Sequence, residues 1–339
     1  MQADTPGDIP APTPSPEHGT ARRPSARPRR AARAGGGPSL LAPGAAHDPY
    51  RLYRVLREEY PLIYDAPLGA WLVSRYDDVA TALTDPGFAG FPHDGAPRGG
   101  PAPQGLCHGN FRCLPSDRYA MPTGSVPGHL AERVERTAYV LARRIAQRPQ
   151  ADLVEEFCRW LPAGAPAADT GTSCTRHTGL RQTALASFLA NLLDDPDLMA
   201  AMRIEPALTG RAWTESLRRD PPVQVVLRRT VTEVTLSGGT LPARAPVACL
   251  IGSAGRDPER FAAPDVFDPF RRDQDRGTPG PAGCPAVLLG RLEAEQGLRA
   301  LLDAMPGLRW AEGFRPAATG LLTRGPRSLL VRPWTGRPG

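Results

Sequence analysis

The residues of this chain that could do chemistry include six cysteines, spread widely along the sequence: Cys107, Cys113, Cys158, Cys174, Cys249 and Cys284. No two of them form a C-x-x-C pair, and the chain is too long to need a disulfide framework. Cys107-His108 with Cys113, or Cys174 with His177, would each make only half of a zinc site. Because no second half follows, we interpret these side chains as isolated thiols and imidazoles.

One charged pair is spaced to interact along a helix. Glu215 and Arg218 are three residues apart, which places them on one face of the helix predicted over residues 208–217. The sequence has no phosphate-binding glycine-rich loop, no H-E-x-x-H motif and no nucleophile elbow. These residues therefore give no independent catalytic constellation.

The elements that must position these residues are mainly helical. Apolar residues recur at helical spacing over residues 52–59, 130–147, 153–160, 185–193, 198–202, 208–217 and 287–304. In the second of these helices the stripe consists of Leu130, Val134, Ala138, Leu141 and Ile145. Ser74 and Asp77 have capping-box spacing at the start of a further short helix that stops at Pro86-Gly87. Short strands are predicted near 62–64, 71–73, 225–228, 231–236, 247–251, 321 and 329–331.

The remaining segments have no periodicity. Residues 1–40 hold six arginines among proline, alanine and glycine, so we predict a disordered tail followed by one domain over 41–339. Residues 90–128 are predicted to form a long loop, and residues 163–178 are small and polar.

Composition excludes several functions. All 41 positive charges are arginine, and with the many alanines, prolines and glycines this indicates high-GC codon usage rather than nucleic-acid binding, despite a net charge of +6. No run of 18 apolar residues and no signal peptide are present, so we expect a cytoplasmic protein with no membrane partner.

Several segments, in order along the chain, carry a family pattern. They are Asp48-Pro49-Tyr50 with 69–79, Glu215-x-x-Arg218, 252–258 with Phe267-Asp268-Pro269, and Cys284 followed by 290–294. Over most of residues 47–339 the chain resembles bacterial cytochrome P450 proteins. The resemblance implies a mostly α fold with small β-sheets. It also implies that this fold is shortened and degenerate, because much of the substrate lid after Leu161-Pro162 is missing.

The resemblance implies that Cys284 stands at the position of the haem ligand and that Arg228 stands where a haem propionate could be met. The surroundings depart from the family. Pro285 removes the first backbone N–H that could donate to the sulfur. The loop aromatic, loop glycine and propionate-pairing residue of the family are replaced here by Gly277, Thr278 and Ala282. We therefore predict no cofactor, with Cys284 a metal ligand only if haem is bound.

Two further departures concern oxygen activation and a structural clamp. The family's oxygen-relay stretch falls on residues 176–181, where no carboxylate and no properly placed threonine remain. The arginine that the family uses to hold Glu215 and Arg218 is replaced by Val266. We therefore predict that Glu215 and Arg218 are an isolated structural remnant, and that the chain has no catalytic residues.

A frame with these losses resembles the haem-free auxiliary proteins that accompany glycosyltransferases in antibiotic biosynthesis. That resemblance implies a non-catalytic activator in a hetero-oligomer. Its partner glycosyltransferase would attach a deoxyaminosugar to a macrolide or anthracycline polyketide aglycone. We expect the shortened lid to expose apolar area that this partner covers. Cys284 departs from many members of that group, which leaves a divergent haem-thiolate monooxygenase of secondary metabolism as the alternative. A reading frame that no longer folds well is a third possibility.

Overall fold

The computed structural model describes residues 37–90, 128–164, 175–273 and 285–333; for 175–177 and 285–288 it describes only the backbone. The helices are α1 (Pro49–Glu59), α2 (Tyr76–Thr84), α3 (Gly128–Ala146), the π-helical η1 (Val154–Cys158), α4 (Trp160–Gly164), α5 (Thr175–Leu193), α6 (Pro196–Ile204), α7 (Leu208–Arg219), α8 (Ile251–Ala254) and α9 (Pro285–Ala304). The strands are β1 (Leu62–Asp65), β2 (Ala70–Val73), β3 (Phe88–Gly90), β4 (Ala151–Asp152), β5 (Val225–Thr230), β6 (Val234–Leu236), β7 (Gly239–Leu241), β8 (Pro246–Leu250), β9 (Arg309–Trp310), β10 (Ala318–Thr319), β11 (Gly325–Pro326) and β12 (Leu330–Arg332).

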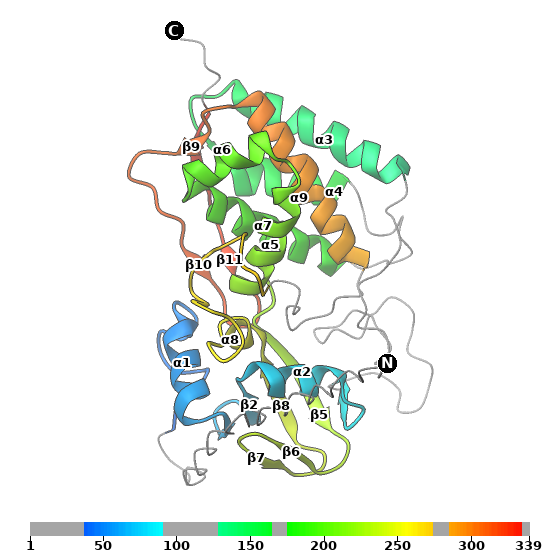
Figure 1. The fold of residues 1–339 in the computed structure, drawn as a ribbon, viewed down its shortest axis with the longest axis vertical. Coiled ribbons are helices and arrows are strands. Elements are labelled where there is room, and N and C mark those ends of the chain that lie inside the picture. Colours follow the sequence, from blue (N-terminus) through cyan, green and yellow to red (C-terminus); the bar gives the residue numbers. More distant parts are fainter. Residues whose placement is uncertain (1–36, 91–127, 165–174, 274–284, 334–339) are drawn as a thin grey trace, which may run out of the picture.

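The helices α3, α5, α6, α7 and α9 form one half of the molecule, shown in the upper part of Figure 1. The helix α9 contacts α3, α5 and α7, so it lies at the centre of this half. The largest apolar core cluster lies here and includes Phe157, Phe188 and Leu301. The predicted stripe of α3 is confirmed except at one position, because Ala142 is buried in place of the predicted Leu141. Within the described ranges, none of the helices combines the length and the apolar character of a membrane span.

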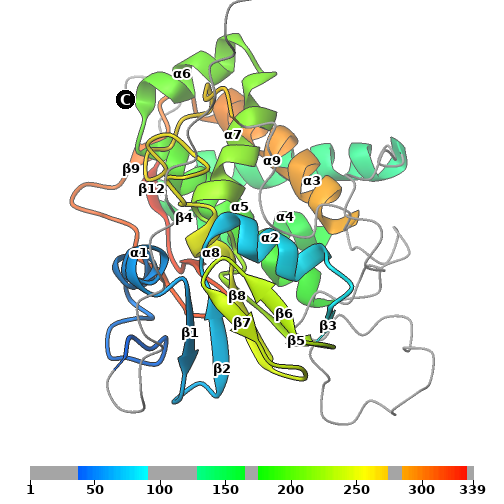
Figure 2. The same ribbon diagram turned by 60° about the horizontal axis from the view of Figure 1, so that its bottom comes forward.

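A five-stranded sheet in the order β1-β2-β8-β5-β3 forms the other half, with α1 and α2 beside it (Figure 2). The predicted hairpin is confirmed as β1 and β2, with Leu62 opposite Val73. β8 pairs parallel to β2 and antiparallel to β5. The prediction of a strand over 231–236 is only partly right, since β6 covers Val234–Leu236 and a hairpin with β7 follows.

The start of α2 corrects the predicted capping box. The N-cap residue is Arg75, and the hydroxyl of Ser74 is buried without a hydrogen-bond partner among the described residues. The backbone N–H of Tyr76 donates instead to Asp257 Oδ2 at 2.8 Å. The N-terminus of α2 is therefore capped by a carboxylate that is distant in the sequence.

Two boundaries also differ from the predictions. Leu40, inside the segment predicted as a tail, is buried, and its N–H donates to Asp65 Oδ2 at 2.8 Å, so the ordered chain begins before residue 41. The helix α5 begins at Thr175, within the stretch predicted to lack periodicity. Only residues 165–174 separate the ends of α4 and α5 along the chain. The predicted loop over 90–128 lies almost entirely outside the described residues.

Candidate functional site

The central feature of the helical half is a buried arginine–glutamate pair between α5 and α9. Arg181 on α5 donates through Nη1 to Glu293 Oε1 on α9, and through Nη2 to the carbonyl oxygen of Pro162 at 3.0 Å. Both side chains are buried. A Cβ on Gly290 would lie only 3.1 Å from the Trp213 ring, so glycine leaves room for this ring beside Arg181.

The electrostatics of this pair are set by its burial. Desolvation raises the pKa of Glu293 to about 8, because the loss of water outweighs the attraction of Arg181. Glu293 Oε2 has no hydrogen-bond partner among the described residues. The free-energy cost of burying this carboxyl group is therefore larger when the group is ionised than when it is protonated.

The Glu215–Arg218 pair is part of a larger clamp, which overturns the prediction of an isolated remnant. Arg218 donates to both oxygens of Glu215 at 2.7 and 2.8 Å. Arg271 donates through Nε to Glu215 Oε1 at 2.9 Å, and through Nη2 to the carbonyl oxygen of Val266 at 3.2 Å. The Val266 side chain is 56% exposed. An arginine five residues further along the chain thus takes the place expected for residue 266.

The sequence contains the arginine that completes this clamp, but the sequence alone does not identify it. Arg271 follows Phe267-Asp268-Pro269 closely, and the backbone N–H of Asp268 also donates to Glu215 Oε1 at 3.0 Å. The adjacent Arg272 is exposed, and nothing in the sequence distinguishes the two arginines. The fold decides which of them turns inward.

Arg228 is held by the end of a helix. Its guanidinium donates through Nε to the carbonyl oxygen of Ala82 at 3.2 Å and through Nη2 to that of Leu83 at 2.7 Å. These are carbonyl groups of the last turn of α2, where a cation also meets the negative end of the helix dipole. In this structure Arg228 therefore caps α2.

The other predicted positions give little chemistry. Cys158 and Cys249 are buried and free of disulfides, and burial raises the pKa of the Cys249 thiol to about 12. In the part of the chain that is described, no group of three or more His, Cys, Asp or Glu side chains could hold a metal ion. The positions that lie outside the described residues are Cys107, Cys113, Cys174, Gly277, Thr278, Ala282 and Cys284.

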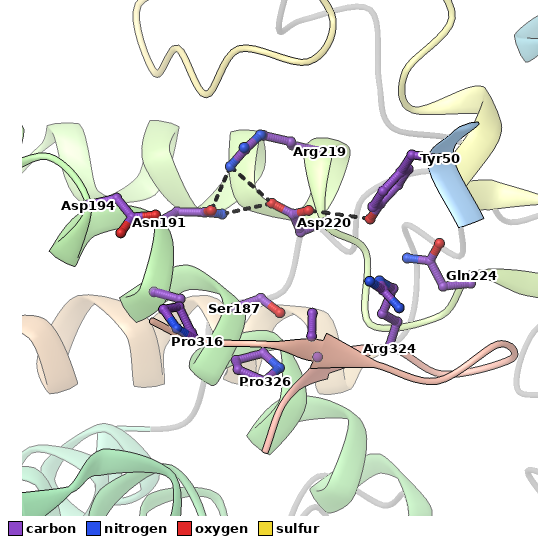
Figure 3. Close-up of a pocket in the computed structure, with 13 residues that line it drawn as sticks. Tyr50, Ser187, Asn191, Asp194, Arg219, Asp220, Gln224, Pro316, Arg324 and Pro326 are labelled. Atoms are coloured by element: carbon purple, nitrogen blue, oxygen red, sulfur yellow. Dashed lines mark hydrogen bonds and ion pairs between the residues drawn. The ribbon is translucent and has the colours of Figure 1, made fainter. Parts of the chain in front are cut away.

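A cavity of about 180 Å³ opens between α5, α7, α1 and the β10–β11 hairpin (Figure 3). Several of its polar groups are paired with one another: Asp220 accepts from Tyr50 at 3.3 Å and from Asn191 at 3.2 Å, and Arg219 donates to Asn191 at 2.8 Å. Burial, together with Asp220, raises the pKa of Tyr50. We assign this cavity no reaction.

Comparison with known proteins identifies the family of this chain. The Cytochrome P450 family model matches residues 182–283. Protein DesVIII of Streptomyces venezuelae is 30% identical over 85% of this chain and 86% of its own length. The chain belongs to the cytochrome P450 family. Protein AknT of Streptomyces galilaeus is 34% identical over 54% of this chain, and pulcherriminic acid synthase of Bacillus subtilis is 35% identical over 43%. These last two matches span less than half of either relative, 44% and 39%.

Solved structures of cytochrome P450 proteins have the same fold. CYP109E1 from Bacillus megaterium superposes with a TM-score of 0.66 at 19% identity, covering 85% of this chain and 98% of that one. CalO2 gives a TM-score of 0.67 at 22% identity, covering 88% and 99%. The prediction of a mostly α, shortened cytochrome P450 fold is therefore confirmed.

The described residues do not fit an oxygen-activating haem. Gly179, Leu180 and Arg181 occupy the end of the relay stretch expected on α5 and offer neither carboxylate nor hydroxyl, so only Thr178 supplies a hydroxyl among the described side chains of this stretch. The Arg181 guanidinium is directed to Glu293 and Pro162 instead. Arg228, the position expected to meet a propionate, donates to the end of α2. No reaction step through haem follows from this geometry.

The first prediction concerns the clamp. Arg271→Ala should lower the free energy of unfolding by about 3 kcal/mol, because it leaves the Glu215 carboxylate buried with one charged partner fewer. Arg272→Ala, which removes the neighbouring exposed guanidinium, should change it by less than about 0.5 kcal/mol. Urea unfolding followed by circular dichroism measures both. Equal effects of the two substitutions would contradict the assignment of Arg271.

The second prediction concerns Glu293. Its folded-state pKa of about 8 lies above its ordinary value, so the folded protein binds this proton more tightly than the unfolded chain. The free energy of unfolding should therefore fall as pH rises from about 5 to about 8. Glu293→Gln should flatten this slope, whereas Glu295→Gln, at a partly exposed position, should not. Urea titrations at several pH values give the slopes, and a wild-type slope retained in Glu293→Gln would refute the expectation.

Proposed function

We propose that this protein is a non-catalytic member of the cytochrome P450 family that binds and activates a partner glycosyltransferase in antibiotic biosynthesis. The observation that carries the proposal is the Arg181–Glu293 pair. Arg181, in the stretch where the family's oxygen relay is expected, instead contacts Glu293 between α5 and α9. The fold of the family is retained. A chain that keeps the fold and loses the relay is suited to binding rather than oxidation.

The relatives support this view through their coverage. The name of DesVIII does not mention an oxygenase activity, and this protein matches 85% of this chain. Relatives named as cytochromes P450 or as a synthase match 36–44% of it. Over most of its length this chain is thus similar to a protein that is not named for oxidation. We propose the same auxiliary role that the sequence resemblance implies.

The proposed mechanism is a shift of population in the partner. If the glycosyltransferase alternates between inactive and active conformers, a protein that binds only the active one raises activity without supplying a catalytic residue. Such complexes commonly bury more than about 2,000 Å². We propose that this takes place in the cytoplasm without haem, and that the sugar transferred is a deoxyaminosugar placed on a polyketide aglycone.

One observation favours a second candidate. Cys284 remains at the position that the family resemblance gives to the haem ligand, directly before α9 begins at Pro285. A divergent haem-thiolate monooxygenase would need this thiolate, and relatives named as cytochromes P450 match parts of the chain. The absorption spectrum separates the two candidates.

The third prediction is that the protein does not retain haem. Protein produced with excess haem precursor should show no Soret band, and after reduction with carbon monoxide it should show no thiolate-type peak. A cytochrome P450 enzyme produced in the same cells provides the positive control. A stoichiometric Soret band would establish the monooxygenase candidate instead.

The fourth prediction is activation of a glycosyltransferase. The chain should co-purify with the glycosyltransferase encoded nearest to its gene and raise its rate of sugar transfer from a nucleotide-activated deoxyaminosugar to a polyketide aglycone. Cys284→Ala should activate as well as the wild type, because the effect is one of association. If the two proteins neither associate nor differ in activity, the proposal fails.

A further inference from the structure

A helical hairpin at the periphery of the helical half exposes two large apolar side chains. The helix α3 lies along the outside in both views, and the chain returns beside it through η1 and α4 (Figures 1 and 2). A Cβ on Gly164 would lie 2.9 Å from Thr137, so α3 and α4 approach closely at this point. Val140 is 62% exposed and Trp160 is 54% exposed. Val140 follows Thr137 by three residues on α3, and Trp160 precedes Gly164 by four residues on α4, so each lies about one helical turn from that contact. Because the chain turns back between the two helices, both residues are displaced from the contact in the same direction.

The fold does not need these two side chains for its core. The face of α3 that contains Val134, Ala138 and Ala142 is buried, and α3 packs against α9. The apolar area expected from loss of the lid is not found on α5, since none of the large exposed apolar residues belongs to the described side chains of that helix. Among the described residues, the α3–α4 hairpin instead presents such side chains on adjoining helices.

Arginines flank this apolar pair. Arg136 and Arg144 are exposed and lie four residues before and after Val140 on α3. Neither forms an ion pair in the described part of the chain. Arg159 lies 5.9 Å from the Trp160 ring and pairs with Glu155 at 2.9 Å. Arg144 lies in the last turn of α3, where a positive charge interacts favourably with the helix dipole. The helix dipole does not explain why Arg136 and Trp160 are exposed.

We propose that Val140, Trp160, Arg136 and Arg144 form the surface that binds the glycosyltransferase, an inference that rests on the proposed function. The partner surface would combine carboxylates facing the arginines with an apolar recess for the indole. Tryptophan and arginine are among the residues most enriched at the energetic centres of protein interfaces. A second copy of this chain is a poorer occupant, because it would bring arginines against arginines.

The experiment measures the dissociation constant between the full chain and the glycosyltransferase encoded nearest to its gene. Trp160→Ala and Val140→Glu should each weaken binding by about tenfold or more, as loss of a hot-spot residue does. Arg136→Glu with Arg144→Glu should weaken it and reduce its dependence on salt. Ile204→Glu, at an 87% exposed apolar position on α6, is the matched control and should bind within about twofold of wild type.

Thermal unfolding and circular dichroism of each variant show whether the fold is intact. If the wild type binds and the α3–α4 variants bind equally well, this surface is wrong while the proposed function stands. If the wild type does not bind the glycosyltransferase, both fail. If the chain alone forms a dimer that Val140→Glu dissociates, the occupant is a second copy and the proposal is overturned.

Discussion

The contact between α5 and α9 is the constraint on which the helical half depends. Both helices contribute to the largest core cluster, and the Arg181–Glu293 pair lies buried between them. Taking a guanidinium and a carboxyl group out of water is costly unless each finds a partner, so the two helices can approach only in a register that brings these groups together. The carbonyl oxygen of Pro162 adds the end of α4 to the same point.

Several polar residues that the family pattern includes hold elements of the fold together. Arg228 caps the end of α2, and Asp257 caps its beginning. The clamp of Glu215, Arg218 and Arg271 ties α7 to the segment that follows α8. Because each of these groups has a partner in the folded chain, the fold is supported in regions where the catalytic pattern of the family is altered.

The described residues offer two places where another molecule could bind, a cavity and an outer surface. Several side chains of the 180 Å³ cavity are paired with one another, and we assign it no reaction. The α3–α4 hairpin, by contrast, presents an indole and exposed arginines to solvent. A function based on association is consistent with both features.

The sequence by itself determined the elements whose signals are local. The apolar period predicted α3 and α9, alternation and turn residues predicted the β1–β2 hairpin, and ordered motifs predicted the family fold. Only the tertiary structure decided the polar partners: Asp257 rather than Ser74 caps α2, Arg271 rather than residue 266 completes the clamp, and Arg181 reaches Glu293. The reason is that periodicity records which face of an element is buried, whereas a hydrogen bond between residues far apart in the sequence depends on how the elements pack.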